Sequence, residues 1–258
     1  MKNKNIYATF LLALIIGLGS IVYADKMTFL ASDDSFVNGF VPEDNYGSLT
    51  FARLRWQTEA DWGRIFPLYK FDLSELPPLV WINWARMRFY VGLADDSGPG
   101  WSVTTNFCPV AVYNNLEDWD EVTVNYNNRP ACTSIAVQEL EHFGLLGVDD
   151  VFFTYYDFIS SGGWLEYYDG SEGTGIRDLV QEWADGSNNY GVTIKGTTYY
   201  VTDPSRYFDL QTKENSSAPV RPSLIVDYMP VPEPAALAIL GIFAAGALAV
   251  RRRFKKSE

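Results

Sequence analysis

Apolar and polar side chains alternate with a period of two at several places along the 258-residue chain, and this alternation restricts the fold more than any other feature. In residues 85–91 four apolar side chains alternate with two arginines and a tyrosine, and residues 122–126 and 224–228 repeat the pattern. A period of two gives a β-strand one apolar face and one wet face. Each stretch therefore predicts a half-buried antiparallel strand.

Other apolar runs are separated by turn-rich pieces such as residues 95–100 and 185–189. The further strand candidates are residues 27–30, 49–56, 66–73, 110–113, 151–158 and 191–195. Aromatic residues make up 16% of the chain, which suits strands rather than helices. About nine strands at this spacing predict an all-β fold, a jelly-roll-like antiparallel β-sandwich.

Residues 174–185 break the alternation and predict one short amphipathic helix on the sandwich. Thr174 stands where an N-cap belongs, and Gly186 stands where a C-terminal glycine belongs. Four apolar residues follow the spacing of one helix face, which we interpret as core packing: Ile176, Leu179, Val180 and Trp183.

The N-terminus has the composition of a secretory signal peptide. Lys2 and Lys4 precede an apolar core at residues 6–22, and small residues at 22 and 24 suit cleavage by a signal peptidase. We expect residues 1–24 to be removed and residues 25–229 to form the exported domain. An uncleaved N-terminal anchor is the alternative, because the apolar core is long for a signal peptide.

The C-terminus predicts a transmembrane helix. Residues 235–250 carry no charge and would form a helix of roughly 24 Å, slightly shorter than the ~30 Å hydrocarbon core. Five basic residues follow within 251–256 and would hold this end in the cytoplasm. The alternative is a buried C-terminal helix of a soluble protein, but such a helix would need a polar face, and this one has none.

The order of features in residues 230–258 resembles the PEP-CTERM sorting signal of exported bacterial proteins. Pro232, Glu233 and Pro234 come directly before the apolar segment, and the basic tail ends the chain. The resemblance implies an exosortase-type processing protease as a partner, in bacteria that make an exopolysaccharide matrix. It also implies a protein that the C-terminal helix first anchors in the membrane and that then reaches the cell surface or extracellular matrix.

The exported part is strongly acidic. Residues 25–230 carry 13 lysines and arginines against 30 aspartates and glutamates, a net charge of −17. This charge argues against nucleic acid as a partner, because the phosphates would be repelled. Four arginines could form a basic patch, although we expect them to pair with carboxylates: Arg53, Arg55, Arg86 and Arg88.

A series of short motifs runs across the exported part: Asn45-Tyr46-Gly47, the runs at 70–76, 85–90 and 119–125, Pro130, and the run at 221–224 before Tyr228. In this order they resemble the DNRLRE-type domain, which is grouped with carbohydrate-binding module family 96. The resemblance implies a jelly-roll sandwich that binds polysaccharide. Tyr126 stands where that family more often has tryptophan, and no catalytic partner module accompanies the domain.

We do not expect an enzyme. His142 is the only histidine, and no serine-centred nucleophile motif accompanies it. The function we predict is non-catalytic polysaccharide binding by an exported protein. A purely structural surface protein without a glycan site is one alternative, and a polysaccharide-degrading enzyme is another.

Tryptophans beside loops are the candidate glycan-binding residues, because an indole ring can stack on the apolar face of a sugar. These candidates are Trp56, Trp62 and Trp101. Trp119 lies within an acidic run at 117–121 and could stack in the same way, although core or edge packing is the interpretation we favour.

Asp33 and Asp34, joined by Asp227 if the terminal strands pair, are the candidate metal ligands. Calcium takes six to eight oxygen ligands and tolerates irregular geometry, so a structural calcium ion is the cofactor these residues would hold. A turn with solvated aspartates is the alternative, and the one we favour.

Cys108 and Cys132 are the only cysteines, and both lie in the exported part. Oxidising conditions outside the cytoplasm favour a disulfide between them. A bridge closing a loop of about 25 residues would contribute on the order of 3 kcal/mol. Two buried free thiols are the alternative.

Overall fold

The computed structural model describes the sandwich domain and leaves both chain ends outside the description. The described residues are 24–55, 65–92, 110–133, 138–140, 163–169, 175–196 and 207–231. Within these residues the protein is mostly β-sheet with one short α-helix, consistent with the predicted β-sandwich.

All strand pairings among the described residues are antiparallel. The strands are β1 (Asp25–Asn38), β2 (Phe51–Arg55), β3 (Ile65–Phe71), β4 (Val80–Gly92), β5 (Val110–Asn114), β6 (Gln138–Leu140), β7 (Gly163–Asp169), β8 (Val192–Gly196), β9 (Tyr207–Gln211) and β10 (Ser223–Pro230). The α-helix is α3 (Ile176–Ala184), and a 3-10 turn covers Ala218–Val220.

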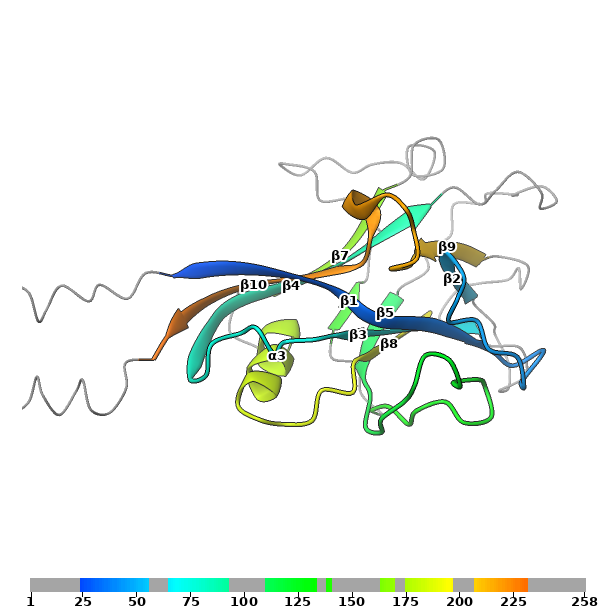
Figure 1. Ribbon diagram of the computed structural model, residues 1–258, viewed down its shortest axis with the longest axis horizontal. Helices are drawn as coiled ribbons and strands as arrows, with labels where there is room; N and C mark the ends of the chain where they lie inside the picture. Colours follow the sequence, from blue (N-terminus) through cyan, green and yellow to red (C-terminus); the bar gives the residue numbers. More distant parts are fainter. Residues whose placement is uncertain are drawn as a thin grey trace, which may run out of the picture.

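The strands form two layers that are joined through shared strands. Neighbouring strands follow the order β1-β10-β4-β9-β2-β3-β8-β5-β6, with β7 paired to β4 and β1 paired back to β3. One layer contains β7, β4, β10 and the first half of β1, and the other contains the strands from β9 to β6 (Figure 1). Because β1 pairs with both β10 and β3, it closes the circuit of strands around the core.

A β-bulge lets β1 belong to both layers. Residues 25–30 pair with β10, residues 31–38 pair with β3, and the register shifts between Ala31 and Asp33. A bulge bends its strand and increases the local twist, which is how a strand passes from one sheet to another at the corner of a sandwich.

The two strands predicted from alternation at 85–91 and 224–228 are confirmed. Ala85, Met87 and Phe89 are fully buried, whereas the arginines between them are half-buried. Residues of β10 lie opposite them, with Val226 beside Ala85 and Leu224 beside Met87. Their inward faces form part of a single core between the layers.

The strand predicted at 122–126 is wrong, because this segment is a series of turns. The Asp120 carboxylate accepts hydrogen bonds from the Val122 N–H (3.0 Å) and the Thr123 hydroxyl (3.1 Å). The Asn125 side chain similarly accepts the Asn127 N–H at 2.9 Å. Such local bonds compete with a β-ladder, and Val122 ends 75% exposed instead of facing the core.

The same segment covers the outer side of β3. Val124 and Trp119 pack on Phe66 and Leu68 in a second, smaller hydrophobic cluster. Since Tyr69 and Phe71 of β3 belong to the main core, this strand is buried on both faces.

The predicted helix is confirmed as α3, with all four residues of its apolar stripe buried. It begins after Gly175, one residue later than the predicted cap, and Thr174 lies outside the described residues. Gly186 has φ +102°, and its N–H donates to the Trp183 carbonyl, while the Ser187 N–H donates to the Glu182 carbonyl. This pair of bonds is a Schellman motif, which explains the glycine at the helix end.

The transmembrane helix in the predicted fold class is corrected. Within the described part of the chain, no helix is both long and apolar enough to cross a membrane. The nine residues of α3 span roughly 14 Å, about half of a hydrocarbon core. The segment assigned to the span, residues 235–250, lies outside the described residues.

Candidate functional site

The layer of β1, β10, β4 and β7 turns one row of side chains away from the core, and we call this row the outer face. Its described members combine aromatic, basic and acidic groups. The aromatic and charged members are Lys26, Trp81, Trp84, Arg86, Arg88, Tyr90, Trp164, Glu166 and Asp227.

Strand register builds this face directly from the sequence alternation. Arg88 lies opposite Glu166, and Tyr90 lies opposite Trp164, on the paired strands β4 and β7. Asp227 lies opposite Trp84 on the other side of β4. The register shifts between Asp227 and Tyr228 of β10, and this bulge leaves Asn83 as an extra, unpaired residue in β4. The Asn83 amide donates to Asp227 Oδ1 at 2.6 Å.

One buried carboxylate binds two arginines at the centre of the outer face. Arg88 Nε donates to Glu166 Oε1 at 2.6 Å, and Arg86 Nη1 donates to Glu166 Oε2 at 3.2 Å. The Glu166 side chain is only 7% exposed, so these charge-assisted bonds are shielded from solvent. One negative charge therefore orients two guanidinium groups on neighbouring positions.

Cations also lie over the tryptophan rings of this face. Arg88 Cζ is 4.1 Å from the Trp164 ring centre, and Tyr90 meets Trp164 edge to face at 5.3 Å. Lys26 Nζ lies 4.9 Å from the Trp84 ring centre, and Arg86 Cζ lies 5.9 Å from it. These cation–π contacts hold the indole rings in fixed orientations.

Trp81 is the most exposed aromatic side chain among the described residues of the outer face. It is 58% exposed, while Val80 and Ile82 on either side are buried at 4% and 1%. Since Trp81 and Trp84 lie on one strand, on either side of the bulge, they offer two ring surfaces along the same direction.

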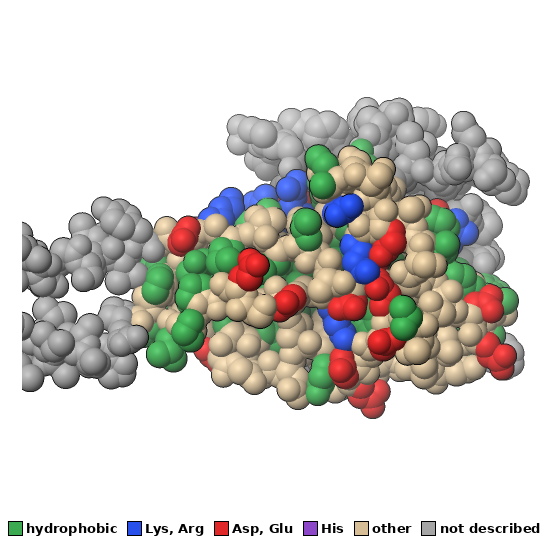
Figure 2. Space-filling view, viewed as in Figure 1, with side chains coloured by type: hydrophobic (Ala, Val, Ile, Leu, Met, Phe, Trp, Pro, Cys, Tyr) green, Lys and Arg blue, Asp and Glu red, His purple; other side chains and the backbone are tan. Residues whose placement is uncertain are grey.

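The local charge of the outer face differs from that of the whole protein. Three basic side chains, Lys26, Arg86 and Arg88, stand against the two acidic side chains of Glu166 and Asp227, within a chain of net charge −12. Figure 2 shows basic side chains gathered along one margin of the domain, while acidic and basic groups are mixed on the side turned to the viewer. Aromatic rings beside hydrogen-bonding charged groups suit a polar ligand with apolar ring faces.

The arginine pairing expected from the sequence is confirmed for three of the four arginines. Besides Arg86 and Arg88, Arg53 forms a two-bond pair with the buried Asp209, at 2.8 and 2.9 Å. The side chain of Arg55 lies outside the description.

The three tryptophans predicted to bind glycan cannot be placed on this face or elsewhere. Trp56, Trp62 and Trp101 lie outside the described residues, so their role stays a prediction. Sequence reasoning did not select Trp81, Trp84 or Trp164, although the alternation at 85–91 already assigned the adjoining arginines to the wet face.

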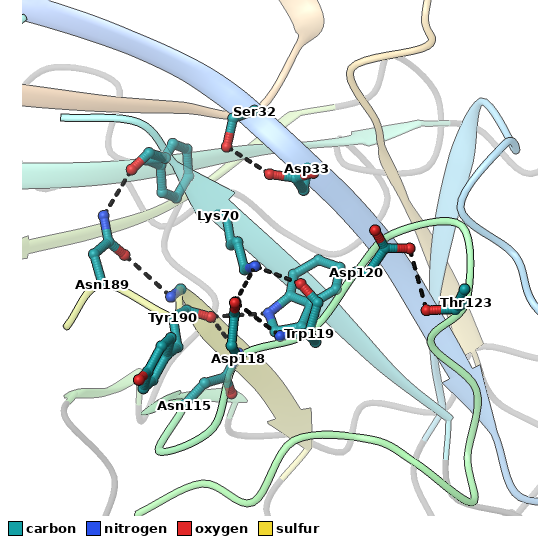
Figure 3. A network of polar contacts seen from close by, with 12 residues as sticks. Ser32, Asp33, Lys70, Asn115, Asp118, Trp119, Asp120, Thr123, Asn189 and Tyr190 are labelled. Atoms are coloured by element: carbon teal, nitrogen blue, oxygen red, sulfur yellow. Dashed lines mark hydrogen bonds and ion pairs between the residues drawn. The ribbon is translucent and has the colours of Figure 1, made fainter. Parts of the chain in front are cut away.

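Trp119 is structural, as we favoured. It is 7% exposed, and its indole N–H donates to the Tyr190 carbonyl at 2.8 Å. Lys70 Nζ binds Asp118 at 2.6 Å and also the Trp119 carbonyl, and the hydrogen bond from Lys70 lowers the pKa of Asp118 (Figure 3). This network joins the 118–120 segment to β3 and occupies the groups that a ligand would need.

A hollow of about 390 Å³ lies near this network and is the second candidate site. Lys70, Asp72 and Asn189 contribute polar groups to its lining. Its aromatic side chains, Phe71 and Trp183, are 1% and 6% exposed, so their ring faces belong to the core. The hollow lacks the exposed aromatic surface that the outer face provides.

The predicted metal ligands do not come together as one cluster. The terminal strands do pair, but Asp227 lies opposite Lys26, seven residues along β1 from Asp33. Asp33 accepts a hydrogen bond from the Ser32 hydroxyl at 2.9 Å. Asp34 is fully buried and lies instead near Glu121 and Glu214, two residues that the sequence did not connect with it.

Cys132 is half-buried, and Lys195 Nζ lies 2.6 Å from its Sγ. Its predicted partner, Cys108, lies outside the described residues, so the bridge stays a prediction. Pro232, Glu233 and Pro234 also lie outside the described residues, directly after the last described residue, Val231.

Comparison with known families supports a carbohydrate-binding module as the body of the chain. Residues 25–143, slightly less than half of the chain, match the family model of carbohydrate-binding module family 96. The matched part includes β1 to β6 and therefore the β4 side of the outer face, while β7 and β10 lie beyond it. No curated protein matches the chain.

Proposed function

We propose that this protein is an exported, non-catalytic polysaccharide-binding protein that holds a glycan chain on its outer face. The match of residues 25–143 to a carbohydrate-binding family supports this function. The observation that carries the choice of site is the row of Trp81 and Trp84 on one strand beside guanidinium groups held by Glu166.

Each group of the outer face has a distinct task in this proposal. Trp81 and Trp84 stack on the apolar C–H faces of successive sugars, and Arg88 fixes the orientation of Trp164. The guanidinium and carboxylate groups form hydrogen bonds with sugar hydroxyls. Because Glu166 compensates much of the arginine charge, the ligand is a neutral or weakly charged polysaccharide.

Binding of a soluble neutral β-glucan to the full chain, measured by isothermal titration calorimetry, tests the proposal. Trp84→Ala and Trp81→Ala should each weaken binding about tenfold, equivalent to about 1.4 kcal/mol. Phe40→Ala is the matched control, because Phe40 is 51% exposed and lies beyond β1, away from the outer face. Its variant should bind as the native protein does.

Salt dependence separates this ligand class from a strongly anionic one. Affinity should change little between about 0.05 and 0.5 M salt, because stacking does not depend on ionic screening. Steeply salt-sensitive binding of a polyuronate that is lost in Arg86→Ala would overturn the choice of ligand. Release of reducing ends from a bound glycan would overturn the non-catalytic function.

Sorting by an exosortase, with delivery to the cell surface or matrix, is part of the same proposal. The Val231 N–H donates to the Leu79 carbonyl at 2.7 Å, and the Pro232-Glu233-Pro234 motif follows at once in the sequence. Proline has no N–H and cannot extend a β-ladder, which favours a motif open to a protease. Replacing the motif with alanines should stop the shortening of the exported chain, as followed by mass spectrometry.

A further inference from the structure

Three carboxylates from distant parts of the sequence meet beside β1. Asp34 belongs to β1, Glu121 to the turns after β5, and Glu214 to the segment after β9. Each offers an oxygen that lies within 4.8 Å of the oxygens offered by the other two. We propose that Asp34, Glu121 and Glu214, named here the carboxylate cluster, bind a calcium ion.

The hydrogen bonds within the carboxylate cluster fix its shape. The Asp34 N–H donates to Glu121 Oε1 at 3.0 Å, and the Lys213 N–H donates to Asp34 Oδ2 at 2.6 Å. Lys213 Nζ binds Glu121 Oε2 at 2.7 Å and Glu214 Oε1 at 2.9 Å. One side of the cluster is therefore held by backbone and lysine donors.

Two oxygens on the remaining side have no donor when Asp34 and Glu214 are both ionised. Asp34 Oδ1 and Glu214 Oε2 are both buried without a hydrogen-bond partner. Asp34 is 0% exposed, so its side chain is shielded from bulk solvent. A buried carboxylate oxygen without a partner costs free energy, and a bound cation removes that cost.

The charge of the carboxylate cluster fits a divalent ion. When all three carboxylates are ionised, Lys213 compensates one of the three charges and the cluster carries a net charge of −2. The ionised cluster is thus under-compensated in the absence of a cation.

The ligand chemistry favours calcium over other divalent ions. All three side chains offer hard carboxylate oxygens, and the cluster contains neither histidine nor cysteine, which zinc prefers. Two oxygens bound to one calcium ion at about 2.4 Å lie no more than about 4.8 Å apart, which agrees with the cluster spacing. Magnesium demands a smaller, near-octahedral shell and usually keeps several of its bound waters. A buried Asp34 leaves little space for these waters.

Calcium here would join three segments that lie far apart in sequence. Glu121 lies in the turns that cover β3, and Lys213 and Glu214 follow β9. The ion would tie both segments to β1, where the strand passes between layers. Its role is independent of the outer face and of the glycan.

Calcium titration of the full chain after treatment with a chelator tests the inference. Calorimetry should detect one site per chain, and the unfolding temperature should rise by about 5 to 10 °C when calcium exceeds its Kd about a hundredfold. Magnesium at the same concentration should give a clearly smaller rise. Absence of both the heat and the shift would overturn the site, and an equal response to magnesium would overturn its assignment to calcium.

Two variants and one control locate the site. Asp34→Asn and Glu214→Gln keep the side-chain shapes and should each lower calcium affinity more than tenfold. Asp33→Asn is the matched control, because Asp33 is the adjacent aspartate and pairs with Ser32 outside the carboxylate cluster. Circular dichroism verifies that each variant is folded. Because the Glu214 side chain is 24% exposed, Glu214→Gln should disturb the fold less than Asp34→Asn. Native calcium affinity in both cluster variants would show that the ion binds elsewhere.

Discussion

Arg88 on β4 and Glu166 on β7 lie directly opposite each other and form a 2.6 Å hydrogen bond on the outer face. The carboxylate also binds Arg86, so a single side chain sets the position of two guanidinium groups. Because Arg88 in turn lies over Trp164, the arrangement links charge pairing to aromatic orientation.

Glu166→Gln should lower the free energy of unfolding by about 1–3 kcal/mol, because it removes a buried charged acceptor shared by two donors. Urea unfolding measures the loss. Asp118→Asn is the control, since that carboxylate also pairs with a cation, Lys70, but is 72% exposed. The control should cost no more than about 0.5 kcal/mol, and a similar loss in both variants would contradict the importance of burial.

Gln181→Ala should destabilise the protein by about 1–3 kcal/mol. The Gln181 amide accepts the Ile82 N–H at 2.8 Å and donates to the Val80 carbonyl at 3.0 Å. It therefore takes the place of a neighbouring strand along this part of β4. Thermal unfolding measures the loss. The control is Glu182→Ala, which changes an exposed residue of the same helix and should alter stability by no more than about 0.5 kcal/mol.

Gly47→Ala should destabilise the protein by about 1–3 kcal/mol through steric overlap. A Cβ at Gly47 would lie 2.3 Å from the Glu121 carbonyl oxygen, and the neighbouring Asn45 amide already binds that oxygen at 2.7 Å. Gly186→Ala is an informative comparison, because its φ of +102° is strained but no atom lies within 4 Å. A calcium affinity that falls in Gly47→Ala and not in Gly186→Ala would show that the contact positions Glu121.

Stability in calcium-free buffer should fall as pH rises from about 5 to 8. Burial raises the pKa of Asp34 to about 8, above the ordinary carboxyl value near 4, so the folded state binds more protons than the unfolded state between these values. The stabilising contribution is complete below the unfolded pKa and is lost as pH passes the folded pKa. The groups around Asp34 are Lys213, Glu214, Glu121 and Tyr69.

Urea unfolding at several pH values compares native protein with Asp34→Asn, which cannot titrate at this position. The native free energy of unfolding should decrease relative to the variant across that pH range. Parallel pH profiles would contradict the raised pKa of Asp34.

Much of the fold followed from local pattern. The period of two at 85–91 and 224–228 and the helical spacing at 176–183 each produced the expected element, because the residues of each predicted apolar face reach the same core. The pairing of Arg53, Arg86 and Arg88 with carboxylates also followed, since a strongly acidic chain leaves few cations without a nearby partner.

Local pattern failed where side chains compete with the backbone. Residues 122–126 alternate as well as the true strands do, but Asp120 and Asn125 take up the N–H groups that a ladder would use. The strands β7 and β9 were not predicted either. β7 lacks a regular alternation of apolar and polar residues, and the alternation in β9 covers only residues 208–211, so pairing with β4 and β2 decides their conformation.

The sequence by itself determined the β-rich class, the helix at 176–184 with its glycine end and the wet face that carries Arg86 and Arg88. Only the tertiary structure decided which residues share a site. Trp81, Trp84 and Glu166 meet through strand register, and Asp34, Glu121 and Glu214 meet through a bulged strand and two distant turns. Spacing along the chain records the period of one element, whereas a binding site depends on contacts between elements, and those contacts form only when the core closes.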